Sequence, residues 1–274
     1  MSKGELNNTE SFLRKREMYC VSACSRFSRI KDGGSGHVWY MKNGKNDISA
    51  LLLHHRHSLF PIFNKKTNLP GPKFLNRFLG KVYIHAIQGI KEDVELLESL
   101  MEKQGYYALE RIDYDLMCLN VKPSHNFLRP DIPGLIFRLP MPGDKEDLIQ
   151  LQAAYEKEEV IPKNGIFNPA SSRYSFNRLL NREQFLLAEL KGKVIGKINT
   201  SSQSFTRFQI GGVYILPEYR GRGIAARMTA LFLEDLLSQG KGITLFVKKR
   251  NAPARAVYRK LGFMAISDYR INYY

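Results

Sequence analysis

A glycine-rich loop with two arginines lies near the C-terminal end of the 274-residue sequence. The loop Arg220-Gly221-Arg222-Gly223 follows the apolar residues Val213-Tyr214-Ile215, and Ile224 and Ala225 begin an apolar periodic segment directly after it. Glycine lets a ligand approach the main chain closely, and the unpaired amides and positive dipole at a helix start favour an oxyanion there. Because Arg220 and Arg222 would add full positive charges, the pattern predicts a site for a phosphate group.

Two common phosphate-binding loops are excluded by spacing. The Walker loop ends in Gly-Lys-Ser or Gly-Lys-Thr, and the dinucleotide fingerprint has a longer glycine spacing followed by an acidic residue after the next strand. The segment from Arg220 to Ala225 has neither feature. The phosphate is therefore expected in a loop of a different kind.

Hydrophobic spacing indicates which elements would position this loop. A strand ends at Ile215, an amphipathic helix runs from Ile224 until Gly240 stops it, and a buried strand follows at residues 242–247. A second helix begins with Asn251 as its cap and with a proline in its first turn.

The other strands of this region are expected to complete one sheet. Residues 184–190 and 194–200 have the pattern of a hairpin, and residues 267–273 that of a strand closing the sheet. Gly211 and Gly212 lie inside the strand that ends at Ile215, where glycines commonly mark a bulge or a close backbone approach; a simple flexible turn is the alternative.

This succession of elements resembles the GNAT acetyltransferase superfamily. The family's cofactor loop has the form Arg/Gln-x-x-Gly-x-Gly/Ala, and its second signature is Asn followed by Ala, Tyr and Gly-Phe. The residues that match these two signatures are Arg220, Gly223, Ala225, Asn251, Ala254, Tyr258 and Gly262-Phe263. The resemblance covers the chain from about residue 135 to the end. It implies an α/β (α+β) fold with a mixed, mostly antiparallel central sheet flanked by helices.

The resemblance also implies acetyl-CoA as the acyl donor. The strand ending at Ile215 and the strand from residue 243 would splay apart, and the pantetheine arm would pair with the main chain of Val213 and Ile215. The residues expected to bind the cofactor are Val213, Tyr214, Ile215, Arg220, Gly221, Arg222, Gly223, Ile224, Ala225, Asn251 and Ala254.

Transfer of an acyl group to an amine sets three chemical requirements. The amine must be neutral, the carbonyl oxygen gains charge, and the leaving thiolate departs more easily when an acid protonates it. Backbone amides near Val213 or Ile215 are expected to stabilise the oxyanion, and Tyr258 is the expected acid. Glu158 and Glu159 are candidates for the base, acting through water.

Asn251, Tyr258 and the two glutamates also have a purely structural interpretation. Asn251 is a good helix cap without any ligand. Tyr258 belongs to an apolar stripe with Ala254, Val257 and Leu261, which is typical of a core position. The acidic run that contains Glu158 and Glu159 is more typical of a solvated surface.

The length of the chain exceeds the needs of one such domain, so we expect two. A proline-rich stretch suggests a linker at residues 126–134, between an N-terminal domain at 1–125 and a catalytic domain at 135–274. The front half repeats the order of elements, with a helix at residues 91–104. Where a phosphate loop should stand, Gln88 to Asp93 has one glycine and early acidic residues, which predicts a degenerate copy in the tandem that binds no cofactor.

Composition excludes several classes of protein. Three cysteines imply no disulfide framework, and no apolar run approaches the roughly 20 residues of a membrane span. The N-terminal residues are charged, unlike a signal peptide, so we expect a cytoplasmic protein without a membrane partner. His54, His55 and His57 do not have the spacing of a zinc site, so we expect no metal.

The formal net charge of +16 is larger than one cofactor explains. A nucleic-acid partner is disfavoured but not excluded, because the basic residues are scattered and no recognisable binding motif accompanies them. We expect an acetyl-CoA-dependent N-acetyltransferase whose acceptor is a small-molecule or peptide amine, and we leave a homodimer open. The alternative from another class is a non-catalytic acyl-CoA-responsive adaptor or a basic RNA-associated protein.

Overall fold

The structure is a computed structural model that describes residues 2–45, 47–64, 71–121, 132–163 and 165–274. The chain forms two compact units. Unit 1 comprises Met1–Met117, Phe246–Asn251 and Ala265–Tyr274, and unit 2 comprises Cys118–Leu245 and Ala252–Met264. The two units therefore alternate along the sequence instead of following one another. Most of the expected linker, residues 126–131, lies outside the described residues.

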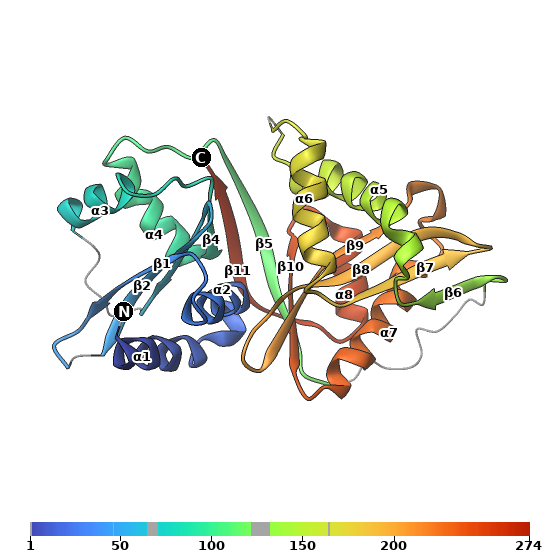
Figure 1. The fold of residues 1–274 in the computed structure, drawn as a ribbon, viewed down its shortest axis with the longest axis horizontal. Helices are drawn as coiled ribbons and strands as arrows, with labels where there is room; N and C mark the ends of the chain where they lie inside the picture. Colours follow the sequence, from blue (N-terminus) through green and yellow to red (C-terminus); the bar gives the residue numbers. More distant parts are fainter. Residues whose placement is uncertain (1, 46, 65–70, 122–131, 164) are drawn as a thin grey trace. The chain divides into compact units, whose positions relative to one another are not determined.

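Unit 1 is a sheet with helices on both faces (Figure 1). Its main elements are α1 (Lys3–Arg14), α2 (Val21–Lys31), β1 (His37–Lys42), β2 (Ile48–His55), β3 (Ser58–Phe63), α3 (Pro72–Leu79), β4 (Ala86–Ile90), α4 (Lys91–Glu102), β5 (Glu110–Leu119) and β11 (Met264–Tyr273). Strand β2 is buried at every position, as expected of a strand covered on both faces. Ala50 and Leu52 pack with α3 and α4, while α1 and α2 also contact β2.

The C-terminal strand β11 differs from the expectation that it closes the sheet of the second domain. It lies between β4 and β5 in unit 1. Its pairing with β4 is antiparallel, from Tyr269 opposite Ile90 to Tyr273 opposite Ala86. Tyr269 and Ile271 are buried there in a cluster with residues of β4 and β5. The front half therefore supplies the apolar surface that this strand buries.

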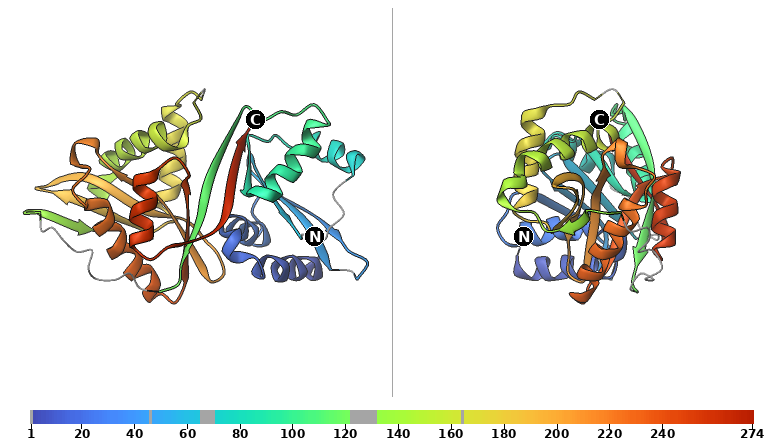
Figure 2. Two further views of the ribbon diagram at one scale, coloured as in Figure 1. Left: turned by 180° about the vertical axis from the view of Figure 1, so that it is seen from behind. Right: turned by 90° about the vertical axis from the view of Figure 1, so that its right-hand side faces the viewer.

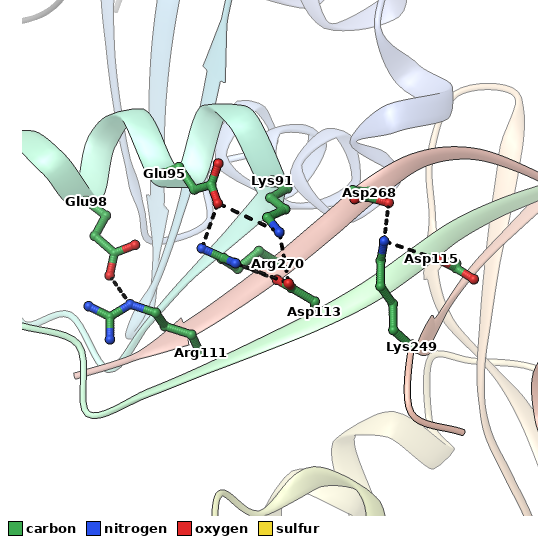
Figure 3. Close-up of polar contacts among 9 residues, drawn as sticks. All are labelled: Lys91, Glu95, Glu98, Arg111, Asp113, Asp115, Lys249, Asp268 and Arg270. Atoms are coloured by element: carbon green, nitrogen blue, oxygen red, sulfur yellow. Dashed lines mark hydrogen bonds and ion pairs between the residues drawn. The ribbon is translucent and has the colours of Figure 1, made fainter. Parts of the chain in front are cut away.

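Ion pairs in unit 1 hold β11 in register (Figure 3). The Arg270 guanidinium donates to Asp113 of β5 at 2.6 and 3.1 Å and lies 2.9 Å from Glu95 of α4. Lys91 Nζ donates to the same Asp113 carboxylate at 3.0 Å. The hydrogen bond from Arg270, with help from Lys91, lowers the pKa of Asp113 to about 2. A second cation, Lys249, lies 2.6 Å from Asp268 of β11.

Unit 2 is a mixed, mostly antiparallel sheet, as the sequence predicted. Its main elements are β6 (Leu135–Arg138), α5 (Lys145–Tyr155), the π-helical turn η4 (Glu156–Val160), α6 (Pro169–Leu180), β7 (Phe185–Leu190), β8 (Lys193–Gln203), β9 (Arg207–Ile215), α7 (Ile224–Ser238), β10 (Gly242–Lys248) and α8 (Ala252–Lys260). The last three residues of β10 fall in unit 1. The strand order is β10-β9-β8-β7-β6, and only β9 and β10 run parallel among the pairs of this order.

Helices cover both faces of the sheet in unit 2. Figures 1 and 2 show α5 and α6 on one face and α7 and α8 on the other. Phe176 of α6 and Leu148 of α5 pack on one face against Phe185 and Leu187 of β7. Phe232 and Leu236 of α7 are buried on the opposite side. In neither unit is a described helix both long enough and apolar enough to cross a membrane.

We predict that Asp113→Asn lowers the free energy of unfolding by about 1–2 kcal/mol at pH 7, because the pKa of Asp113 is depressed in the fold. A carboxylate whose pKa is lowered in the folded protein stabilises the fold at pH values above its unfolded pKa of about 4. This stabilisation is lost as the pH falls through the pKa of the folded state. Denaturant unfolding at pH 7, 5, 4 and 3 measures it. The difference from wild type should shrink below pH 4; a pH-independent difference would contradict the ion-pair origin. The exposed Asp32→Asn is the matched control.

Candidate active site

Strand β9 carries the bulge that Gly211 and Gly212 predicted. Lys197 of β8 lies opposite Tyr214, and Asn199 lies opposite Gly211, so β9 has one residue more than β8 in this interval. Gly212 has a φ of +61°, in the left-handed region. A Cβ on Gly212 would collide with Asn199 Oδ1 and lie 2.7 Å from Lys197 Nζ. Only glycine fits this position, for both its backbone angles and its contacts.

The end of β9 lies beyond its pairing with β10. The parallel register runs from Arg207 opposite Gly242 to Gln209 opposite Thr244, whereas β9 continues to Ile215. Val213 is half-buried in this terminal part of the strand, and the side chains of Tyr214 and Ile215 are buried. The main chain of β9 therefore extends past the paired segment toward the glycine loop.

The glycine loop has the geometry of an anion site at a helix start. Gly221 has a φ of +75° and Gly223 a φ of +76°, both in the left-handed region, and Gly223 caps α7. A Cβ on Gly221 would meet nothing within 4 Å, so a ligand can approach here. Ile224 is buried and anchors the helix, while Ala225 is half-buried. The first amides of α7 are thus available to an oxyanion.

The two arginines of the loop have different surroundings. Arg222 is exposed and donates to Glu218 O at 3.2 Å. Arg220 turns back on the protein, donating to Ile215 O at 2.8 Å and to both carboxylate oxygens of Glu158 at 2.7 and 2.8 Å. The paired Glu158 raises the pKa of Arg220. Because Glu158 neutralises Arg220, the positive charge left for an anion comes from Arg222 and the helix amides.

The π-helical turn η4 brings the predicted acidic residues beside the loop. Such turns are often found at functional sites. Glu158 reaches Arg220, as described, and Glu156 accepts from Gln152 Nε2 at 2.7 Å. Glu159 is half-buried and close enough to Tyr258 to raise the pKa of that phenol. The acidic run is therefore ion-paired in part, through Glu158.

Tyr258 lies on α8 with 8% of its surface exposed. Burial raises the pKa of its phenol, and Tyr155 and Glu159 add to the increase. Its ring packs edge-on against Phe263, with centroids 5.7 Å apart. The hydroxyl stays protonated at neutral pH, which suits a proton donor and rules out a base. The same burial also fits a core position for Tyr258.

Asn251 and Ala254 lie at the start of α8. Asn251 directly precedes the helix, and its backbone N–H donates to Lys248 O at 2.9 Å. This is the place expected of a capping residue. Ala254 lies in the first turn and is half-buried.

Lys197 of β8 is a polar residue that sequence reasoning missed. It is 0% exposed, and its Nζ donates to Asn199 Oδ1 and to Gly212 O, each at 3.0 Å. Burial lowers the pKa of this lysine to about 7, a shift that Glu156 partly offsets. A signal was present in the sequence, because Lys197 lies two residues after Ile195 and therefore on the same face of the predicted strand as that apolar residue.

The corresponding place in unit 1 is occupied by the protein's own side chains. Helix α4 follows β4 directly, and its first residue, Lys91, is held by Asp113 and Glu95 at 3.0 and 3.8 Å. Asp93 in the same turn accepts from Phe63 N at 3.2 Å. An anion here would meet these carboxylates. Across the described residues of both units, no group of three or more His, Cys, Asp and Glu side chains could hold a metal ion.

Residues 149–263 match the model of the acetyltransferase (GNAT) family. Among curated proteins, a mycothiol acetyltransferase from Amycolatopsis mediterranei is 31% identical over 140 residues, which are 47% of this chain and 46% of that protein. The matched segment spans about half the length of the curated relatives with this name.

Solved structures resemble the chain over its full length. The X-ray structure of a Drosophila protein has a TM-score of 0.68 at 13% identity and covers 100% of this chain and 97% of its own. A tandem GNAT protein from the clavulanic acid biosynthesis pathway has a TM-score of 0.63 at 10% identity and covers 99% and 95%. At such identities the likeness concerns the fold alone. The fold is a tandem of GNAT-type domains, as the sequence predicted.

We predict that Gly212→Ala destabilises unit 2 more than Gly221→Ala does. Both substitutions place alanine in the left-handed region, which destabilises the fold by about 1–2 kcal/mol. Only the methyl group introduced at Gly212 also collides with Asn199 and Lys197. We expect a total loss of about 3 kcal/mol or more for Gly212→Ala. Thermal and denaturant unfolding of the two variants measures the difference. Equal losses of stability in the two variants would show that Asn199 and Lys197 move away from the added methyl group at little cost in free energy.

The family match and the geometry concern the same residues. The matched segment contains the bulged strand β9, the glycine loop at Gly221 and Gly223, and the buried Tyr258. The GNAT family uses acetyl-CoA as its acyl donor, and a loop of open amides at a helix start fits the phosphates of such a donor. Residues 149–263 therefore belong to the GNAT superfamily of acetyltransferases.

Proposed function

We propose that this protein is an acetyl-CoA-dependent N-acetyltransferase that transfers an acetyl group to a primary amine by direct attack on the thioester. The observation that carries the proposal is the continuous path from the bulge at Gly212 along β9 to the glycine loop at the start of α7. A strand that extends past its neighbour and ends at an anion site suits a long ligand with a phosphate at one end. Coenzyme A has that form.

The cofactor residues have complementary roles in this proposal. The pyrophosphate would bind the loop amides from Gly221 to Ala225, with the exposed Arg222 as a nearby cation in the loop. The pantetheine arm would pair with the main chain of Val213 and Ile215. Arg220 supports the site indirectly, because its bonds to Ile215 O and Glu158 fix the end of β9. Asn251 and Ala254 would border the arm from the start of α8.

The acid and the base can be assigned to different residues of unit 2. Tyr258 is the proposed acid for the leaving thiolate, because burial keeps its hydroxyl protonated. Glu159 is the better candidate for the base, because it is half-buried and lies close enough to Tyr258 to raise the pKa of that phenol. Glu159 would accept the proton of the amine through water. The backbone N–H of Val213, next to the bulge, is the proposed donor to the oxyanion.

The acceptor is proposed as a small-molecule or peptide amine. The relatives named mycothiol acetyltransferase match only about half of their length here, so their acceptor is not carried over. Cytoplasmic action follows as a proposal from the nature of the donor. A turnover assay against a panel of amines identifies the acceptor. Tight, salt-dependent RNA binding without thioester turnover would instead support the non-catalytic alternative.

We predict that Gly223→Glu weakens coenzyme A binding by more than about tenfold, because a carboxylate would occupy the anion site and a non-glycine residue would strain the left-handed cap. Calorimetry should give a Kd for wild type in the micromolar range or tighter. Gly192→Glu is the matched control, since Gly192 also has a positive φ, of 82°, with nothing within 4 Å of its Cβ position. Absence of coenzyme A binding by wild type would refute the proposal.

We also predict that Tyr258→Phe lowers kcat by about tenfold or more while the Kd for coenzyme A changes little, because an acid acts on the leaving group and not on binding. Initial rates of thiol release measure kcat. Tyr269→Phe in unit 1 is the control for loss of a buried hydroxyl, as burial raises the pKa of both phenols. Unchanged turnover would assign Tyr258 to the core and not to the chemistry.

A further inference from the structure

The buried lysine Lys197 has an unusual set of partners for a cation. A charged amine removed from water is strongly destabilising unless close partners replace its hydration. The Nζ donates to two neutral oxygens, Asn199 Oδ1 and Gly212 O, and lies over the rings of Tyr155 and Phe176 at 5.1 and 5.8 Å from their centroids. Carbonyl oxygens and ring faces compensate a charge only in part. Burial of this charge therefore destabilises the fold, and a structural role alone does not explain a lysine at this position.

The position of Lys197 connects it to the bulge. Its acceptor, Gly212 O, belongs to the peptide that joins Gly212 to Val213, where β9 has its extra residue. A peptide bond is planar and trans, so its C=O and N–H point in opposite directions. With Gly212 O held on the side of Lys197, the N–H of Val213 must point to the other side. This N–H is the oxyanion donor of the proposed function.

The ammonium group also changes the strength of that donor. Hydrogen bonds linked through one peptide polarise each other, and the effect is larger in a dry interior. A positive charge on the oxygen side draws electron density from the N–H side, which makes the N–H a stronger donor. Asn199 fixes the ammonium by accepting its second bond, and its own Nδ2 donates to Thr200 O at 2.8 Å.

We infer that Lys197, fixed by Asn199, is a positioning residue of the acyl-transfer site that orients and polarises the Gly212–Val213 peptide, so that Val213 N–H stabilises the oxyanion of the attacked thioester. The inference rests on the proposed function. Lys197 is 0% exposed, so it acts through the peptide and does not touch the acceptor. No bond to Lys197 forms or breaks in the reaction.

The role has a consequence for pH dependence. Burial lowers the pKa of Lys197 to about 7, and Glu156 of η4 is the charged group that raises it. The other groups packed on the amine are the phenol ring of Tyr155 on α5, Phe176 on α6 and Asn199 on β8. The charged form polarises the peptide most strongly. Turnover should therefore fall as the pH rises above the range in which Lys197 holds its proton.

Removal of the charge should affect turnover and not cofactor affinity. We expect Lys197→Met to lower kcat about 10-fold to 100-fold, less than the roughly 100-fold to 1,000-fold of a direct oxyanion donor. The Kd for coenzyme A should stay within about threefold, because free coenzyme A has no acyl carbonyl to stabilise. Lys193→Met on the same strand is the matched control, since the Lys193 side chain is 60% exposed.

Two further measurements distinguish positioning from a purely structural role. Lys197→Arg keeps a positive charge at all working pH values, so it should lose the alkaline fall in kcat that wild type shows. In protein labelled with 15N-valine, the amide resonance of Val213 should titrate with a midpoint near the pKa of Lys197, a readout that needs no variant. This spectrum decides the question even where Lys197→Met fails to fold.

Each outcome separates the inference from the proposed function. Coenzyme A binding and turnover by wild type, with Lys197→Met as active as wild type, would overturn the role of Lys197 and leave the acetyltransferase intact. A Val213 resonance independent of pH between 6 and 9 would overturn it as well. Absence of coenzyme A binding by wild type would remove the proposed function itself.

Discussion

The bulge in strand β9 is the constraint on which the site of unit 2 depends. This strand must pair with β8 along one edge and still present main-chain groups to a ligand beyond its pairing with β10. One extra residue at Gly212 allows both, because a bulge bends the strand that carries it. The extra residue has a left-handed backbone conformation, which only glycine tolerates well. The glycine loop and α7 follow directly from this strand, so the place of the amides proposed to bind an anion is set by the register of β9.

The ion pair of Arg220 and Glu158 couples the two sides of the same site. Arg220 stands in the loop expected to bind phosphate, yet its guanidinium joins the end of β9 to the π-helical turn η4. One side chain thereby fixes the strand that would hold the donor and the turn that would border the acceptor. Because both groups are partly exposed, we attribute their effect to geometry more than to the free energy of unfolding.

Unit 1 shows how the same order of elements can be adapted to stability. Its helix α4 directly follows β4, and Lys91, Asp113 and Arg270 form a charge network at the start of that helix. The network also retains the last strand of the chain, β11, which carries Arg270. At the start of α4 the side chains are held by ion pairs, whereas α7 in unit 2 begins with a glycine at its cap.

The sequence alone determined the local features of this protein. The glycines at 212, 221 and 223 marked the places where unusual backbone angles are possible, hydrophobic periodicity predicted the helices and strands around them, and the paired signatures indicated the family. Each of these signals depends on neighbouring residues. Only the tertiary structure decided the long-range partners. It placed β11 in unit 1, paired Arg220 with Glu158 across 62 positions, and buried Lys197 beneath the bulge. Such contacts join residues whose separation in the sequence leaves no periodic signal, so packing and charge complementarity in three dimensions select them.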